Sequence, residues 1–281
     1  MYQTATDRRK NIRDVKEMKI GFIGCGNMAR PIIKGVLDAD LAEVLVTDIA
    51  RASLESFCAG NGAAASTQEE ILAECGVIVL AVKPQVLPSL LPEIAPAING
   101  RRPLVISIAA GKTTAYIASF FEPGIAVARI FPNLNARVKS AVSAYCGNRF
   151  VSEERLSLVR DICGSFGAAF AVPEDKINIF GVLGGCAPAY TFMYIEALAK
   201  AAAAAGFDPA LALEVAAKMT EGSAKLLASS DDAPETLVKN VCSPGGTTIE
   251  GVNSLRGDDF ERLIGRAFDA SLRRDAELAG A

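Results

Sequence analysis

Residues 19–29 read Lys-Ile-Gly-Phe-Ile-Gly-Cys-Gly-Asn-Met-Ala, and this stretch decides the fold. An apolar run leads into a loop with Gly24, Gly26 and Ala29, the G-x-G-x-x-A pattern that turns a buried strand into a helix. Gly24 permits the tight turn, Gly26 lets the backbone approach a pyrophosphate, and Ala29 lets helix and strand pack closely. The helix amino terminus adds N–H groups and partial positive charge. Chance glycines in an ordinary turn are the alternative, but the context favours a nicotinamide dinucleotide site.

Asp48 supports this prediction from the end of the next strand pattern, residues 43–48. It follows the loop at about the ~20-residue offset of dinucleotide-binding domains. A carboxylate there accepts hydrogen bonds from the adenosine ribose and repels a 2′-phosphate, which favours NADH. Arg51 lies close by and could instead accommodate NADPH, or it could be an ordinary surface arginine. The sequence leaves these two interpretations of Arg51 open.

Apolar runs alternate with helical patterns over the first half of the chain. Strands are predicted at residues 43–48, 77–82, 103–108, 126–130 and 143–145, with helices at 28–37 and 52–58. The runs at 77–82 and 103–108 are apolar without interruption, as expected for strands buried on both faces of a parallel sheet. The pattern therefore predicts an α/β fold with a Rossmann-type, doubly wound parallel sheet.

After residue 173 no strand pattern occurs. Helices are predicted at 190–205, at 209–227 with Asp208 as the cap and Pro209 in the first turn, and from 250 onwards. We predict a polar extension over residues 1–17, a dinucleotide-binding Rossmann domain over 18–174, and an all-helical substrate and dimerisation domain over 175–281. The alanine-rich helices have apolar faces that one copy leaves exposed, which suggests a homodimer through this domain.

The composition limits the partners of this chain. A net charge of −3 and a pI of about 5.3 give no reason to expect nucleic acid or an anionic membrane. The uncharged stretch 177–195 could span a membrane by length, but its glycines and Pro188 favour a buried core helix. The absence of histidine excludes Ser-His-Asp and Cys-His catalysis and the usual zinc ligands, and no metal is predicted. Seven scattered cysteines indicate a reducing, cytoplasmic location.

Several short blocks resemble one family. They are Ile20–Ala29, Leu80–Gln85, Ser107–Lys112, Pro132–Asn133, Pro188–Tyr190 and, the most specific, Ser243–Ile249, which reads Ser-Pro-Gly-Gly-Thr-Thr-Ile. From about Met18 to the C-terminus their order and spacing resemble the pyrroline-5-carboxylate reductases. The resemblance implies reduction of 1-pyrroline-5-carboxylate to L-proline, the last step of proline biosynthesis, by hydride transfer from NADH or NADPH to the C=N carbon. It also implies a homodimer that often assembles further.

The turn from Ser243 to Thr247 has the chemistry that such a substrate needs. It leads into a helix predicted at about Thr248, and successive N–H groups there suit the carboxylate of a cyclic imine. The Thr248 hydroxyl can bind the ring nitrogen as the imine becomes an amine, and by resemblance the family's threonine touches this nitrogen. An N-capped turn is the simpler interpretation, and capping is expected to contribute.

The resemblance and the local patterns together place the site residues. Ser243 and Thr248 are expected to be catalytic. Substrate contacts are expected at Ser243, Gly245, Gly246, Thr247, Thr248 and, more loosely placed, Asp231. Cofactor contacts are expected at Ile23, Gly24, Cys25, Gly26, Asn27, Met28, Asp48, Arg51, Gln68, Ala81, Val82, Lys83, Pro84, Ile108, Ala110 and Asn240.

The sequence departs from the family's pattern near the expected substrate. Where the family has Thr-Ala-Leu-Ser-Gly-Ser-Gly-Pro-Ala-Tyr, the threonine and both serines are replaced by Gly181, Gly184 and Cys186. Asn178 stands for a familiar aspartate and Lys239 for a common acidic residue, and Pro-Asn-Thr-Pro becomes Pro-Asn-Leu-Asn at 132–135. Two alternatives therefore stay open. The chain could reduce a different cyclic imine, or it could be a cofactor-binding regulatory paralogue without turnover.

Overall fold

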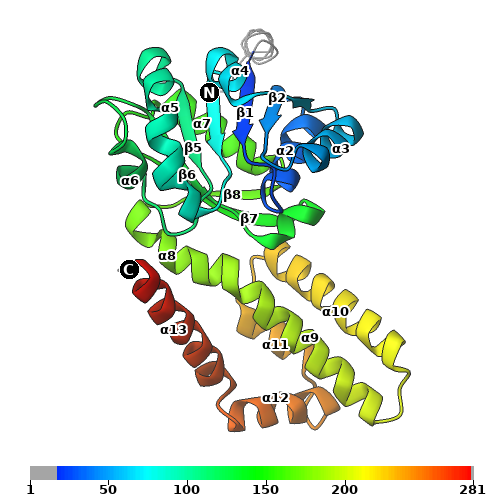
Figure 1. The fold of residues 1–281 in the computed structure, drawn as a ribbon. Helices are drawn as coiled ribbons and strands as arrows, with labels where there is room; N and C mark the ends of the chain where they lie inside the picture. The colour runs from blue at the N-terminus through cyan, green and yellow to red at the C-terminus, as the bar shows by residue number, and fades with distance from the viewer. Residues whose placement is uncertain (1–17, 280–281) are drawn as a thin grey trace, which may run out of the picture. The chain divides into compact units, whose positions relative to one another are not determined.

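The computed structural model describes residues 18–279, which fall into two compact units (Figure 1). One unit ends at Gly185 and carries the sheet, and the other runs from Cys186 to Glu277 and is helical. The polar extension predicted over residues 1–17 lies outside the described residues. The sequence predicts that the Rossmann domain ends at residue 174. In the structure the first unit extends to Gly185, because the short helical turns that follow the last strand belong to it.

The first unit is built on one eight-stranded sheet of order β3-β2-β1-β4-β5-β6-β7-β8. The strands are β1 (Lys19–Ile23), β2 (Glu43–Thr47), β3 (Ala64–Ala65), β4 (Val77–Leu80), β5 (Leu104–Ser107), β6 (Val127–Phe131), β7 (Ala141–Gly147) and β8 (Gly167–Ala171). The predicted Rossmann-type sheet is confirmed, and the first six strands are parallel. The prediction that all strands are parallel is wrong at the edge, because β7 runs antiparallel to β6 and β8 follows β7.

Helices cover both faces of this sheet (Figure 1). One face packs against α2 (Ala29–Asp38), α3 (Arg51–Asn61) and α7 (Glu153–Gly164), the other against α4 (Gln68–Glu74), α5 (Leu87–Arg101) and α6 (Thr114–Ala118). The apolar spacing in α2 puts Ile32, Ile33 and Val36 on the sheet side, and all three are buried. Burial of each such side chain stabilises the fold by about 1.5–3 kcal/mol, which holds α2 behind the glycine loop.

Short helical turns complete the first unit. They are η1 (Pro84–Val86), η2 (Leu134–Val138), η3 (Glu174–Lys176), α8 (Ile177–Phe180) and the π-helical turn η4 (Gly181–Cys186). Glu174 in η3 binds the start of α6, where its carboxylate accepts hydrogen bonds from the Thr114 N–H and hydroxyl, both at 2.7 Å. Buried Arg129 of β6 lies 3.9 Å from the same carboxylate. These contacts fix the loop between β5 and α6, which holds the predicted cofactor residues Ile108 and Ala110.

The second unit consists of α9 (Ala187–Ala204), α10 (Pro209–Ser229), α11 (Pro234–Val241), α12 (Thr247–Gly257) and α13 (Phe260–Ala279). α9 and α10 pack on each other through small side chains such as Ala199, Ala212 and Ala216. Asp208 caps α10 as predicted, accepting the Leu211 N–H at 2.8 Å. The helix expected from residue 250 to the end is interrupted between α12 and α13. None of the described helices is long and apolar enough to cross a membrane.

Candidate active site

An open cavity of 880 Å³ lies where β1, β2 and β4 end. In the sheet, β2 and β3 lie on one side of β1, and β4 and β5 lie on the other, so the strand order reverses at this point. Open α/β sheets bind their ligands at such a switch point. The volume suits a cofactor, since small-molecule sites occupy about 300–1,000 Å³. The lining residues are Ile23, Gly24, Gly26, Thr47, Asp48, Ile49, Arg51, Thr67, Gln68, Glu69, Ala81, Val82, Lys83, Val86, Ser89, Leu90 and Glu93.

The glycine loop, residues 24–29, borders this cavity. Its conformation requires a glycine at position 24. Gly24 has φ +106°, and its N–H donates to the Thr47 carbonyl at 2.8 Å. A Cβ on Gly24 would lie 2.6 Å from the Ala81 carbonyl oxygen, whereas a Cβ on Gly26 would meet nothing within 4 Å. Gly24 is therefore needed by the fold itself. Gly26 leaves open space in front of the backbone, which is what the approach of a pyrophosphate needs.

The N–H groups of the loop divide between the protein and a ligand. The Cys25 N–H donates to Asp48 Oδ2 at 2.6 Å, so it is used within the fold. The N–H groups of Gly26, Asn27 and Met28 have no acceptor in the described part of the chain and are available to phosphate oxygens. The Cys25 side chain is buried in the core, and this burial raises the pKa of its thiol. Below this raised pKa the thiol is neutral and adds no negative charge to the glycine loop.

Asp48 and Arg51 both line the cavity. The half-buried Asp48 carboxylate accepts the N–H of Cys25 and, at 2.8 Å, that of Ala50, so its orientation is fixed while lone pairs remain for ribose hydroxyls. Arg51 Nη1 donates to the Ser66 carbonyl at 2.9 Å, which holds its guanidinium at the same end of the cavity. The carboxylate thus lies where the ribose is expected, and the arginine is held close to it.

The structure brings most of the predicted cofactor residues together, but not all of them. Ile23, Gly24, Gly26, Asp48, Arg51, Gln68, Ala81, Val82 and Lys83 line the cavity. Cys25, Asn27, Met28, Pro84, Ile108 and Ala110 lie in the first unit outside its lining. Asn240 lies in α11 of the second unit, and Asp231 lies in the turn before α11.

Sequence reasoning missed part of the cavity wall. The wall also includes Thr67, the N-cap of α4, and two residues of α5, Ser89 and Glu93. The Glu93 carboxylate accepts a hydrogen bond from the Gln68 amide at 2.6 Å. Ile49 is fully exposed beside Asp48 and offers an apolar wall for a base. The sequence signal for this residue is its position directly after Asp48, the acidic residue that ends the predicted strand. Among residues 18–279 no cluster of three or more His, Cys, Asp or Glu could hold a metal ion.

The turn before α12 places the predicted substrate residues other than Asp231 on one short segment of the second unit. α12 begins at Thr247, one residue before the predicted start, and Ser243 and Thr248 are exposed. Gly245 has φ +70°, a conformation that favours glycine, and the Gly246 N–H donates to the Ser243 carbonyl at 3.0 Å. The expected contribution of side-chain capping is wrong, because the N-cap residue is Gly246. The hydroxyls at 243, 247 and 248 are thus left for other partners.

The altered segment 181–187 packs against Phe131 at Gly181 and Gly185, and against Val142 and Phe180 at Gly184. A Cβ at Gly181 would lie 2.9 Å from Phe131 Cζ, and one at Gly185 would lie 3.0 Å from its Cε1. The ring thus fills the space that side chains at these positions would take. Asn133 ties the segment to the sheet, since its amide donates to the Gly184 carbonyl at 2.8 Å and its oxygen accepts the Val142 N–H. At Gly181 and Gly184 the space that a side chain would take is therefore already occupied by neighbouring side chains.

Comparison with known proteins fits both units. Residues 19–111 match the family model described as NADP oxidoreductase, coenzyme F420-dependent. With the glycine loop and its cavity, this match defines the class: the chain is an NAD(P)-dependent oxidoreductase. Residues 174–278 match the model described as pyrroline-5-carboxylate reductase dimerisation. The pyrroline-5-carboxylate reductase of Escherichia coli is 35% identical over 272 residues, covering 94% of this chain and 99% of its own. The chain belongs to the pyrroline-5-carboxylate reductase family.

Solved structures agree with this assignment. A pyrroline-5-carboxylate reductase from Coxiella burnetii superposes with a TM-score of 0.88 at 28% identity, covering 94% of this chain and 99% of that one. A pyrroline carboxylate reductase from Plasmodium falciparum with NADP bound gives a TM-score of 0.82 at 26% identity, covering 95% and 100%. The similarity extends over both units, so the fold of residues 18–279 follows this family.

Proposed function

We propose that this chain reduces 1-pyrroline-5-carboxylate to L-proline and prefers NADH to NADPH as hydride donor. One observation carries the proposal: the glycine-loop cavity and the Ser243–Thr248 turn occur together in a chain 35% identical to the Escherichia coli reductase. The cavity supplies N–H donors for a pyrophosphate and a carboxylate for a ribose. The turn supplies N–H groups and hydroxyls for a small substrate with one carboxylate.

The proposed mechanism asks for positioning rather than for acid–base groups. When bound, the dinucleotide supplies the hydride. The N–H groups of the turn hold the substrate carboxylate, and Gly245 and Gly246 let the backbone approach it. The Thr248 hydroxyl holds the ring nitrogen while the imine becomes an amine. A protonated cyclic imine is already electrophilic, so the chain needs no histidine, and its contribution is orientation and the exclusion of water.

A steady-state assay with 1-pyrroline-5-carboxylate tests the proposal. NADH should be oxidised with formation of proline, and kcat/KM should be higher with NADH than with NADPH. Turnover of another cyclic imine alone would contradict the substrate while leaving the reductase class intact. Tight NADH binding without turnover of any imine would instead identify a regulatory cofactor-binding protein.

Asp48→Ser should shift the ratio of kcat/KM values toward NADPH by about tenfold or more, because it removes the carboxylate that would face the 2′-phosphate. The measurement is the NADH to NADPH ratio of kcat/KM at constant ionic strength. Asp161→Ser, which removes a half-exposed carboxylate from α7 outside the cavity, is the matched control and should leave the ratio unchanged. An unchanged ratio in Asp48→Ser would remove Asp48 as the selector.

We propose further that the chain forms a homodimer through residues 186–277 and functions in the cytoplasm. Large apolar side chains of the second unit are exposed in a single copy, among them Phe192, Met193, Leu198, Leu213 and Leu226. Burial in a partner copy would remove this surface from water. Light scattering should give a mass of at least twice 29.4 kDa, and a 29.4 kDa species would contradict the dimer. All seven cysteines are free thiols, which fits a reducing compartment.

A further inference from the structure

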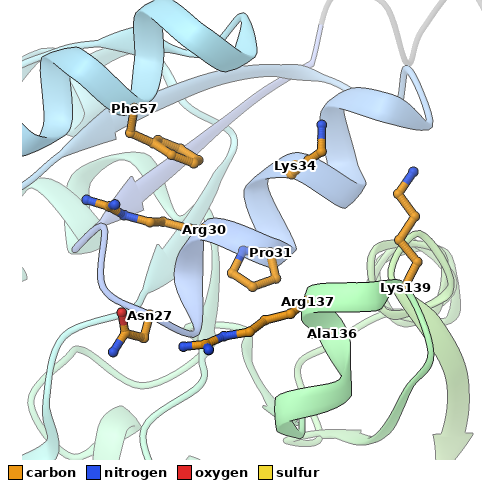
Figure 2. Close-up of a pocket in the computed structure, with 8 residues that line it drawn as sticks. All are labelled: Asn27, Arg30, Pro31, Lys34, Phe57, Ala136, Arg137 and Lys139. Atoms are coloured by element: carbon orange, nitrogen blue, oxygen red, sulfur yellow. The ribbon is translucent and has the colours of Figure 1, made fainter. Parts of the chain in front are cut away.

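A second cavity, of 280 Å³, lies beside the glycine loop on the α2 side of the sheet (Figure 2). It is lined by Asn27, Arg30, Pro31, Lys34, Phe57, Ala136, Arg137 and Lys139. It shares no lining residue with the 880 Å³ cavity. Four of its eight lining residues are basic and none of the eight is acidic. This pocket is thus a separate, positively charged site formed by α2, α3 and η2.

Arg30 is held rigidly at one wall of this pocket. Its Nε donates to the Cys25 carbonyl at 3.0 Å, its Nη2 donates to Ser53 Oγ at 2.7 Å, and its guanidinium lies 5.2 Å from the centre of the Phe57 ring. No carboxylate in the described part of the chain pairs with it, and its other N–H groups remain available. A fixed guanidinium loses little entropy when it binds an anion.

Arg137 provides the second unpaired charge, from η2. It is exposed and forms no ion pair with any residue from 18 to 279. Figure 2 shows the guanidinium ends of Arg30 and Arg137 on the same side of Pro31, with the Asn27 amide beside them. The ends of Lys34 and Lys139 point away from that side. Both lysines already pair with Asp38, at 3.5 and 2.8 Å, so the uncompensated charge is that of the two arginines.

We propose that this pocket binds a phosphoryl group, as free phosphate or as part of a small phosphate monoester. Two guanidinium groups that approach from different elements, together with an amide donor, match a tetrahedral dianion with several acceptor oxygens. A lone carboxylate would leave part of this donor set unused. The volume is slightly below the usual ~300–1,000 Å³ of small-molecule sites, so it suits a small anion better than a whole dinucleotide. The ligand is held by Arg30, Arg137 and Asn27.

Calorimetric titration of the full chain with inorganic phosphate, at constant ionic strength and with NADH saturating, tests the proposal. Phosphate should bind to the NADH complex, and Arg137→Gln should weaken it by at least about tenfold, the effect of losing one charge-assisted hydrogen bond. Arg149→Gln is the matched control, because Arg149 is also exposed and lies over a phenylalanine ring but lines no part of this pocket. It should bind phosphate like the wild type.

Three outcomes would overturn the site. These are equal phosphate affinity in Arg137→Gln and the wild type, an equal loss in Arg149→Gln, and displacement of phosphate by NADH, which would place the ion at the pyrophosphate position instead. A parallel titration with glycerol phosphate distinguishes the two sources. Tighter binding than inorganic phosphate assigns the site to a monoester, and weaker binding assigns it to the free ion. Thermal unfolding of each variant without phosphate verifies that the fold is intact.

Discussion

Replacing Gly24 by alanine is expected to lower the free energy of unfolding of the first unit by about 3 kcal/mol and to abolish NADH binding. The φ of +106° is strained for any residue with a Cβ, which costs about 1–3 kcal/mol. The new Cβ would also lie 2.6 Å from the Ala81 carbonyl oxygen and 3.0 Å from the Val82 nitrogen, which are backbone atoms that cannot turn aside. Because the loop must move away from β4, the N–H groups that face the cavity move with it.

Gly26→Ala separates binding from folding. Its φ is not positive and its Cβ would meet nothing within 4 Å, so the free energy of unfolding should stay within about 0.5 kcal/mol of the wild type. The affinity for NADH should nevertheless fall at least about tenfold, because the methyl group enters the space left for the pyrophosphate. Chemical denaturation and NADH fluorescence titration measure the two quantities. Unchanged NADH affinity in Gly26→Ala would contradict the proposed position of the dinucleotide.

Replacing Thr248 by alanine is expected to lower kcat/KM for 1-pyrroline-5-carboxylate about 100-fold and to leave the Kd of NADH unchanged. A hydroxyl that binds the nitrogen as its charge changes acts in the transition state, and such groups contribute about 10²–10³-fold. Thr248 is exposed in the first turn of α12, so its removal opens no core cavity and should not unfold the chain. Steady-state kinetics and NADH titration check both parts.

Thr236→Ala is the matched control for this prediction. Thr236 is also exposed in the first turn of a helix of the second unit, α11, and lies outside the predicted site. Its replacement should change kcat/KM less than twofold, and Thr248→Ser should recover most of the activity. Full activity in Thr248→Ala would contradict the proposed role of this hydroxyl. A decrease in kcat/KM in Thr236→Ala as large as that in Thr248→Ala would instead indicate general damage to the helical unit.

The glycine loop and the central strands could be predicted because their determinants are local. An uninterrupted apolar run followed by glycines has few alternatives to a buried strand and a turn. The strands β3 and β8 were missed because β3 consists of two alanines and β8 is mostly exposed, so both depend on their pairing with β2 and β7. The reversal of β7 was also missed, since an apolar pattern carries no strand direction.

The candidate site likewise combines residues that can be predicted from local sequence with residues that only packing brings together. Asp48 and the loop could be predicted from their spacing, whereas Ser89 and Glu93 reach the cavity only because α5 packs beside it. The basic pocket was not predicted either, because Arg30 and Arg137 are distant in sequence and meet through the packing of α2 and η2. The contribution of side-chain capping expected for the turn before α12 is absent, because the N-cap residue, Gly246, has no side chain.

The contact between Phe131 and Gly181 also couples these two positions. With the ring in place, a methyl group at position 181 would lie 2.9 Å from Phe131 Cζ, so a side chain at 181 requires the ring to shift. Restoring a threonine at 181 and reducing the side chain at 131 are therefore not independent substitutions, and their effects on the free energy of unfolding should not add.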